Sequence, residues 1–358
     1  MIKVLIVDDS PVTRLNLAHI LAADPGIHVI GSVGSGLKAL DFIKKEKPDV
    51  ITMDIKMPGM DGFETTRKIM ETAPVPIIIV SAIWSPTEEA QSFKAIEAGA
   101  LLCVPTPPGV GDRQYAAAAG QLIAAVKQMA EVKVVRRWPK RKTAQPAIAR
   151  ARQTRMAARE LKLVAVGAST GGPPAVKQFL EQLPENFPVP IVIVQHIAKG
   201  FARGFADWLN NSSPLRVYLA SHSEALWAGR VYVAPDNMQM GVARGGAGTI
   251  ELSNAPPEHY LRPSVSYLFR SVAENFGQAA AGVLLTGMGV DGAAELLLIK
   301  NAGGVTFVQD KESSVVHGMA GEAIRMGAAD HVFPPAGIAA ALTKIVTGAE
   351  TTRDGTTG

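Results

Sequence analysis

A serine in a glycine-rich corner is the first candidate for chemistry in this chain. Residues 161–166 form an apolar run of strand length, and residues 175–183 favour a helix. Between them, Gly167, Ser169 and Gly171 fit the G-x-S-x-G pattern of a nucleophile elbow. The small neighbours let the backbone turn sharply, so that the serine oxygen projects above the strand end. The N–H groups that follow start a helix and point toward a developing oxyanion. The alternative is a glycine-rich turn that binds phosphate, or nothing.

A serine nucleophile needs a base, and His196 is the best placed of the seven histidines. It follows the strongly apolar run 190–194, just as Ser169 follows its own run. Adjacent parallel strands would bring both residues to the same edge of a sheet. The alternative for His196 is a hydrogen-bonded core or loop histidine. The other histidines lie in the N-terminal part or in polar turns: His19, His28, His222, His259, His317 and His331.

The carboxylate that would orient His196 is best sought in the glycine loop 286–292, which holds Asp291. This loop follows a third apolar run, and a helix is expected to begin at Ala293. Asp291 could accept the His196 N–H and fix its tautomer, or it could only cap that helix. Asp310, at the end of the apolar run 305–308, is the rival carboxylate. The order serine, histidine, aspartate differs from that of α/β-hydrolases.

A second group of chemically capable residues is acidic and lies near the N-terminus. Asp8 and Asp9 close the apolar run 4–7, and Asp54 closes the run 50–53. Three carboxylates at one sheet edge repel one another unless a hard cation, most plausibly Mg2+, binds them. Asp54 could then accept a phosphoryl group, and Ser81 could donate a hydrogen bond to it. The alternative is that Asp8 and Asp9 merely cap the helix that follows.

Both groups need an α/β scaffold to position them. Five apolar runs alternate with helical stretches over the first 130 residues, which favours a parallel sheet covered on both faces. These runs are 4–7, 28–33, 50–53, 76–80 and 101–104, and the helical stretches are 11–23, 36–45, 62–72, 87–98 and 114–130. After residue 161, further runs at 190–194, 215–220, 230–234, 281–285 and 305–308 predict a second α/β domain. Some shorter antiparallel strands are expected around 215–253.

Composition limits the classes of protein that fit. A chain of 358 residues with 47% hydrophobic and 19% charged residues suggests about two domains with sizeable cores. No apolar run reaches spanning length and the N-terminus begins a strand, so we expect a cytoplasmic protein without membrane insertion. Its single cysteine, Cys103, lies in an apolar run and is expected to be a core thiol.

The net charge of +4 is concentrated in one segment. Residues 131–160 hold ten Lys or Arg and two Glu, and without them the chain is mildly acidic. Such a run could bind nucleic acid, but prolines interrupt it and Trp138 is its only aromatic residue, so we favour a solvated linker. The Gly- and Thr-rich residues 349–358 are expected to be a disordered tail.

Residues 1–130 resemble the response-regulator receiver domain. The resemblance rests on residues 7–10 (Val-Asp-Asp-Ser), 53–62 (Met-Asp-Ile-Lys-Met-Pro-Gly-Met-Asp-Gly) and 79–82 (Ile-Val-Ser-Ala). It implies a flavodoxin-like, doubly wound fold that is phosphorylated on Asp54 with the help of Mg2+. Receivers carry a lysine at the end of the fifth strand, where it contacts the phosphoryl group. Here Thr106 stands in that place, so we expect weaker coupling of phosphorylation to conformational change.

Residues 161–348 resemble the catalytic domain of the chemotaxis protein-glutamate methylesterases. The resemblance rests on residues 167–172 (Gly-Ala-Ser-Thr-Gly-Gly), 195–196 (Gln-His) and 285–292 (Leu-Thr-Gly-Met-Gly-Val-Asp-Gly). Supporting matches lie at residues 231–235, 262–265 and 309–314. Departures from the family pattern at Ala198, Ser266 and Ala320 fall outside these windows.

The second resemblance implies a function and a set of roles. The family hydrolyses glutamate γ-methyl esters on chemoreceptors and often deamidates receptor glutamines, and the esterase chemistry requires no cofactor. By matched position, Ser169, His196 and Asp291 form the triad, and the N–H groups of Thr170 and Met288 form the oxyanion hole. Expected partners are methyl-accepting chemoreceptors and a chemotaxis histidine kinase, with no nucleic acid.

The predicted domains are a receiver (1–130), a basic linker (131–160), a catalytic domain (161–348) and the tail (349–358). Two readings of other classes remain. One is a receiver-controlled binding module whose Ser-His-Asp set is catalytically silent. The other is a DNA-binding regulator, which the chain disfavours because it shows no helix-turn-helix.

Overall fold

The computed structural model describes residues 1–81, 93, 95–132, 134, 160–243 and 248–348. The described chain divides into two compact units, Met1–Thr143 with Ile197–Trp208, and Ala144–His196 with Leu209–Gly358. The predictions for the basic linker, for the tail and for most of the helix at 87–98 fall outside the described residues. The predicted domain boundaries therefore stay predictions.

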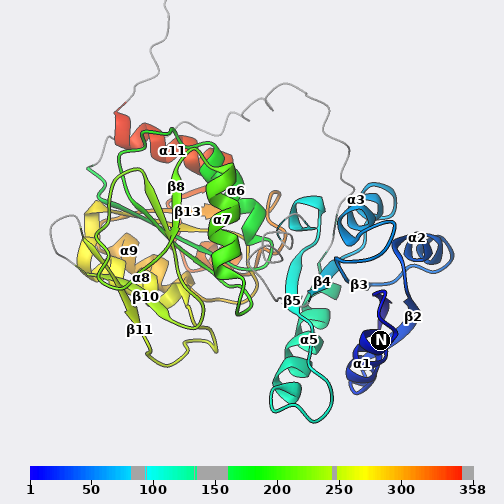
Figure 1. Cartoon of the computed structure of the whole chain (residues 1–358). Helices are drawn as coiled ribbons and strands as arrows, with labels where there is room; N and C mark the ends of the chain where they lie inside the picture. Colours follow the sequence, from blue (N-terminus) through cyan, green and yellow to red (C-terminus); the bar gives the residue numbers. More distant parts are fainter. Residues whose placement is uncertain (82–92, 94, 133, 135–159, 244–247, 349–358) are drawn as a thin grey trace, which may run out of the picture. The chain divides into compact units, whose positions relative to one another are not determined.

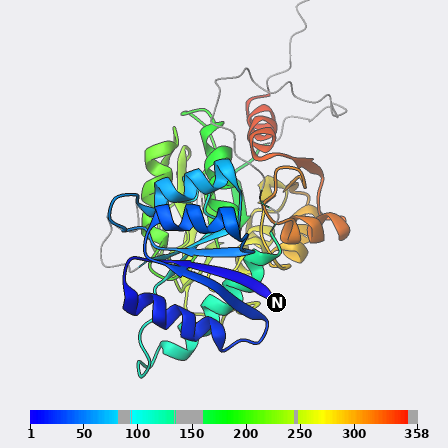
Figure 2. The same cartoon turned by 90° about the vertical axis from the view of Figure 1, so that its right-hand side faces the viewer.

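The first unit is a parallel sheet with helices on both faces, as the alternating pattern predicts. Its strand order is β2-β1-β3-β4-β5, and every neighbouring pair is parallel. Helix α1 packs with α5, and α2 packs with α3, on opposite faces of the sheet (Figure 2). The elements are β1 (Ile2–Val7), α1 (Pro11–Ala22), β2 (Ile27–Val33), α2 (Gly36–Lys45), β3 (Val50–Met53), α3 (Gly62–Thr72), β4 (Ile77–Ser81), β5 (Leu102–Pro105) and α5 (Tyr115–Ala130).

Local sequence explains where these elements begin and why the sheet is buried. Strands β3 and β4 are buried along their whole length, as expected for central strands covered on both faces. Helix α1 begins at Pro11, whose missing N–H costs nothing in the first turn, and the Ser10 hydroxyl accepts the Thr13 N–H. Asp61 caps α3 in the same way by accepting the Glu64 N–H.

The second unit, drawn mostly in green to red in Figure 1, is built on a seven-stranded sheet in the order β14-β13-β12-β6-β7-β9-β8. All neighbouring strands in it are parallel. The strands are β6 (Leu163–Ala168), β7 (Ile191–Gln195), β8 (Arg216–Leu219), β9 (Arg230–Val233), β12 (Ala280–Leu284), β13 (Val305–Gln309) and β14 (His331–Phe333). A separate antiparallel pair is formed by β10 (Gln239–Ala243) and β11 (Thr249–Ser253).

Some shorter antiparallel strands were expected around residues 215–253, and the pair of β10 and β11 confirms this. Strands β8 and β9 instead extend the parallel sheet, with Val217 opposite Val231. The connection between β8 and β9 is ten residues long and holds no helix, which is short for a parallel pair.

Helices cover the second sheet and form the hydrophobic core together with it. Helix α8 packs against α9 and the central strands, and buried side chains of β10 join them in one hydrophobic core cluster. Helix α6 packs against α11. The helices of this unit are α6 (Gly172–Glu181), α8 (Val265–Phe276), the 3-10 turn η1 (Gly277–Ala279), α9 (Ala293–Asn301), α10 (Gly318–Arg325) and α11 (Pro335–Thr347). Helix α7 (Ala202–Ser212) begins in the segment Ile197–Trp208, which belongs to the first unit.

Candidate active site and phosphorylation site

Ser169 lies in the turn between β6 and α6, as the sequence predicts. The turn is closed by the Gly172 N–H, which donates to the Ser169 C=O at 2.8 Å. Gly171 has φ 74° and ψ 1°, the conformation that favours glycine at the third residue of a type II turn. A Cβ on Gly171 would lie 2.4 Å from the Cβ of Val315. Glycine is therefore required both by the turn and by the packing.

His196 lies beside Ser169 because β6 and β7 are parallel neighbours. Ala168 pairs with Gln195, and the His196 N–H donates to the Ala168 C=O at 2.9 Å. The next residues along the two strands are Ser169 and His196, and neighbouring strands lie about 4.8 Å apart. Within the described residues, the Ser169 hydroxyl has no hydrogen bond.

The His196 ring is held by Asp291. The distance from His196 Nε2 to Asp291 Oδ2 is 2.8 Å, and both side chains are almost completely buried. Because Nε2 faces the carboxylate, Nδ1 is the ring nitrogen left for a proton from Ser169. The three strands that precede these residues, β12, β6 and β7, are consecutive in the sheet.

Asp291 accepts four hydrogen bonds, two on each oxygen. Oδ2 accepts from His196 and from the Val265 N–H (2.7 Å), and Oδ1 accepts from the Ser264 hydroxyl (2.8 Å) and the Ser266 N–H (3.1 Å). Burial by itself raises the pKa of Asp291, but the hydrogen bonds and the nearby His196 outweigh it and hold the pKa well below the usual range. The carboxylate also lies at the N-terminus of α8, where the helix dipole favours negative charge. Asp291 is therefore a fixed anion.

Asp291 and its rival Asp310 have different surroundings in the structure. Gly292, not Asp291, is the N-cap of α9, and no side chain caps that helix. The rival Asp310 accepts hydrogen bonds from the N–H and hydroxyl of Ser313, within its own loop. The three donors from the start of α8 were not predicted from the sequence. A serine directly before the helical run that starts at Val265 was the available signal, because serine is a preferred N-cap residue.

The two N–H groups expected to form an oxyanion hole are oriented by their neighbouring carbonyls. The Gly287 C=O accepts from the Gly318 and Met319 N–H groups, at 3.0 Å each. The C=O and the next N–H of a trans peptide point in opposite directions. The Met288 N–H therefore points away from α10, and the Thr170 N–H points away from the donors to the Ser169 C=O. In the described part of the chain, neither N–H has a hydrogen-bond partner.

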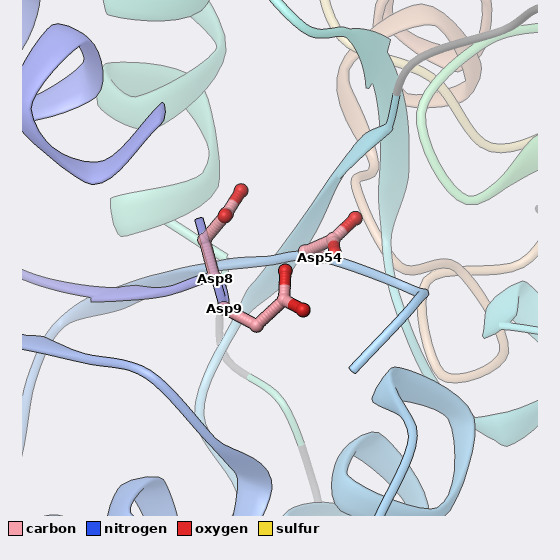
Figure 3. Close-up of side chains that lie close together, drawn as sticks. All are labelled: Asp8, Asp9 and Asp54. Atoms are coloured by element: carbon pink, nitrogen blue, oxygen red, sulfur yellow. The ribbon is translucent and has the colours of Figure 1, made fainter. Parts of the chain in front are cut away.

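The three acidic residues of the first unit meet at the ends of adjacent strands. Asp8 and Asp9 follow β1 and Asp54 follows β3, and one oxygen of each carboxylate lies within 4.8 Å of the others (Figure 3). Burial, followed by the charge of Asp8, raises the pKa of Asp54 to about 6. Burial also raises the pKa of Asp8, with a smaller contribution from Asp9. Crowded carboxylate oxygens fit a hard divalent cation, which would remove this repulsion.

Ser81 and Thr106 lie at the same edge of that sheet. Ser81 pairs with Pro105 across β4 and β5, and the Thr106 N–H donates to the Ser81 C=O at 3.0 Å. Thr106 is thus the residue that follows the fifth strand, where the sequence analysis placed it. Cys103, three residues before Thr106, is a buried thiol, and burial raises its pKa. None of the helices in the described ranges is long and apolar enough to cross a membrane.

Comparisons with known proteins cover almost the whole chain. Residues 164–342 match the family model of the CheB methylesterase, and residues 4–108 match that of the response regulator receiver domain. Two similar relatives are named protein-glutamate methylesterase/protein-glutamine glutaminase. The one from Nitrosospira multiformis is 53% identical over 97% of both chains, and the one from Geobacter metallireducens is 52% identical over 96% of this chain and 99% of its own.

A solved structure agrees with the fold of the second unit. The CheB methylesterase catalytic domain of Thermotoga maritima superposes with a TM-score of 0.51 at 36% sequence identity. The match covers 52% of this chain and 99% of that domain.

Proposed function

The chain belongs to the CheB methylesterase family with a receiver domain, and from this premise we propose that it is a phosphorylation-regulated protein-glutamate methylesterase of chemotaxis. Its substrates are glutamate γ-methyl esters on methyl-accepting chemoreceptors, which it hydrolyses to glutamate and methanol. It also deamidates receptor glutamines. The protein acts in the cytoplasm.

In the first half of the reaction, Ser169 Oγ attacks the ester carbonyl carbon while His196 takes the hydroxyl proton. Since Nε2 of His196 is bonded to Asp291, Nδ1 receives this proton. The negative charge that develops on the carbonyl oxygen is stabilised by the N–H groups of Thr170 and Met288. The tetrahedral intermediate then collapses, and the methoxy group leaves as methanol with the proton from His196.

The second half regenerates the enzyme. A water molecule attacks the glutamyl–Ser169 ester while His196 again takes a proton, and collapse releases the glutamate carboxylate and the Ser169 hydroxyl. A glutamine substrate follows the same course with ammonia as the leaving group. Throughout, Asp291 holds the His196 ring and stabilises the imidazolium that forms in each half.

The observation that carries this proposal is the environment of Asp291. The Asp291 carboxylate is 2% exposed, accepts three hydrogen bonds from the start of α8 and contacts His196. Burying a charge in this way costs desolvation free energy, which a purely structural loop has no need to spend. It suits an orienting group that must remain ionised next to a histidine base. A catalytically silent module would not require it.

The receiver controls the esterase. A chemotaxis histidine kinase donates the phosphoryl group, which Asp54 accepts while the Ser81 hydroxyl donates a hydrogen bond to it. Asp8, Asp9 and Asp54 would hold Mg2+, which offsets the charge of the transferred oxygens. The unphosphorylated receiver restrains the catalytic domain, and phosphorylation releases it.

The experiment that tests the proposal is the release of methanol from a methyl-labelled chemoreceptor incubated with the purified protein. An esterase releases one labelled methanol for each ester lost. Stable binding of the receptor without methanol release would favour the silent binding module.

A further inference from the structure

The side chain that joins the nucleophile loop to the base loop is Gln195. Its Nε2 carries two hydrogens and donates them to two backbone carbonyls, that of Ser169 at 2.8 Å and that of His196 at 2.9 Å. The side chain is at the end of β7 and is 3% exposed. One amide group thus contacts the backbone of both residues that exchange a proton in the reaction.

This arrangement leaves the other end of the amide unsatisfied. Gln195 Oε1 is buried and has no hydrogen-bond partner within the described residues. Exchanging the amide nitrogen and oxygen does not help, because the oxygen would then face two carbonyl oxygens. Oε1 instead packs against Gly172, where a Cβ would lie only 2.1 Å from it. A buried acceptor without a partner destabilises the fold, so its presence requires an explanation.

The other buried glutamines of the described chain do not share this defect. Gln309 accepts the Thr286 N–H on Oε1 and donates to the Ser313 hydroxyl through Nε2. Gln239 accepts the Ser264 N–H and donates to two backbone carbonyls. The unsatisfied acceptor therefore belongs to the one glutamine that contacts both Ser169 and His196.

The two donated bonds fix the geometry that the chemistry needs. The bond to the Ser169 C=O, shared with the Gly172 N–H, sets the plane of the peptide between Ser169 and Thr170. That plane directs the Thr170 N–H to the opposite side, where the oxyanion develops. The bond to the His196 C=O fixes the backbone from which the base projects.

We propose that Gln195 is a positioning residue for catalysis, whose amide holds the Ser169 and His196 backbones in register and aims the Thr170 N–H at the oxyanion. The inference rests on the proposed esterase function. The unsatisfied oxygen is the cost of this arrangement, because a group with two donors is needed to bond the Ser169 and His196 carbonyls at the same time. Gln195 touches neither substrate nor the transferred proton.

The test replaces Gln195 with methionine, which has similar length and no donors. Gln195→Met removes both hydrogen bonds and the unsatisfied oxygen together. We expect kcat for methanol release to fall on the order of 10²-fold, with KM within about threefold. The thermal midpoint should change little, because the Ser169 C=O keeps the Gly172 N–H, and removal of the unsatisfied Gln195 Oε1 offsets the loss of the partner of the His196 C=O. Gln195→Glu keeps the shape but turns an oxygen toward the two carbonyls, and should lose at least as much kcat.

Gln309→Met is the matched control, since it leaves the buried Thr286 N–H without a partner and should lower the thermal midpoint by several degrees. If Gln195→Met keeps kcat within about threefold of the wild type, the inference is wrong. It is also wrong if the loss of kcat comes with a drop in thermal midpoint like that of Gln309→Met, because the role is then structural. If the wild-type protein released no methanol, the proposed function itself would be wrong. The same assay therefore distinguishes failure of the proposed function from failure of the Gln195 inference.

Discussion

Replacing Asp291 with asparagine tests the contact between Asp291 and His196, because the substitution removes the negative charge and hardly changes the shape of the side chain. The carboxylate lies 2.8 Å from His196 Nε2, which puts the centres of the two charges about 4 Å apart when the imidazolium forms. At an effective dielectric constant of about 20, that attraction is worth roughly 4 kcal/mol. Each 1.4 kcal/mol is about a factor of ten in rate, so Asp291→Asn should lower kcat on the order of 10³-fold.

The same change should also cost stability. Each carboxylate oxygen of Asp291 accepts a backbone N–H, Val265 on one side and Ser266 on the other. An asparagine NH2 in either orientation therefore faces one buried donor, which costs about 1–3 kcal/mol. Denaturant unfolding measures this loss separately from the rate of methanol release.

Asp310→Asn is the matched control for Asp291→Asn. The Asp310 carboxylate accepts hydrogen bonds only from Ser313 of its own loop among the described residues, so its replacement should leave kcat within about tenfold of the wild type. If Asp310→Asn slowed hydrolysis more than Asp291→Asn did, the orienting carboxylate would be misassigned and the argument from the α8 donors would be refuted.

The remaining predictions concern the receiver. Deleting residues 1–130 should raise basal esterase activity, and an unchanged or lower rate in a folded fragment would contradict restraint by the receiver. Thr106→Lys should increase activation by phosphorylation, measured as esterase activity with a small phosphodonor and Mg2+ divided by activity without them. The reason is that a lysine ammonium can pair with phosphoryl oxygens, whereas threonine offers one neutral hydrogen bond. An unchanged ratio at equal phosphorylation of Asp54 would show that another group already makes the lysine's contact. The pKa of Asp54 is raised from 3.8 to about 6, so the folded receiver keeps a proton that the unfolded chain releases, and without Mg2+ its stability should fall as pH rises through this window. Asp54→Asn should reduce this fall in the free energy of unfolding by about 1–2 kcal/mol, allowing for solvent screening. Identical pH profiles of thermal unfolding in mutant and wild type would contradict this prediction.

Sequence patterns were sufficient for the parts of the fold that depend on neighbours along the chain. The apolar runs before Ser169 and His196 predict buried parallel strands, and parallel strands end at one edge, so these residues could be brought together without coordinates. The glycine loop after the third run likewise pointed to Asp291. In the first unit, the strand ends predicted the meeting of Asp8, Asp9 and Asp54.

What could not be predicted depends on register between distant segments. Ser264 and Ser266 contact Asp291 from about 25 residues away, and Gln195, at the end of β7, reaches the Ser169 carbonyl beyond the end of the neighbouring strand β6. Such contacts follow from the packing of α8 and from the exact register of β6 against β7, which no local pattern specifies. The parallel pairing of β8 and β9 was missed because short strands joined by a loop usually form antiparallel pairs.

The most direct test of the whole account is the rate of methanol release by Ser169→Ala. The only group removed is the hydroxyl at the elbow, and the turn itself is closed by backbone atoms and Gly171, so the fold should survive. The account predicts a loss on the order of 10³-fold or more in a protein with wild-type circular dichroism and thermal midpoint. Near-normal methanol release by that folded mutant would contradict it, because no serine nucleophile would then be required.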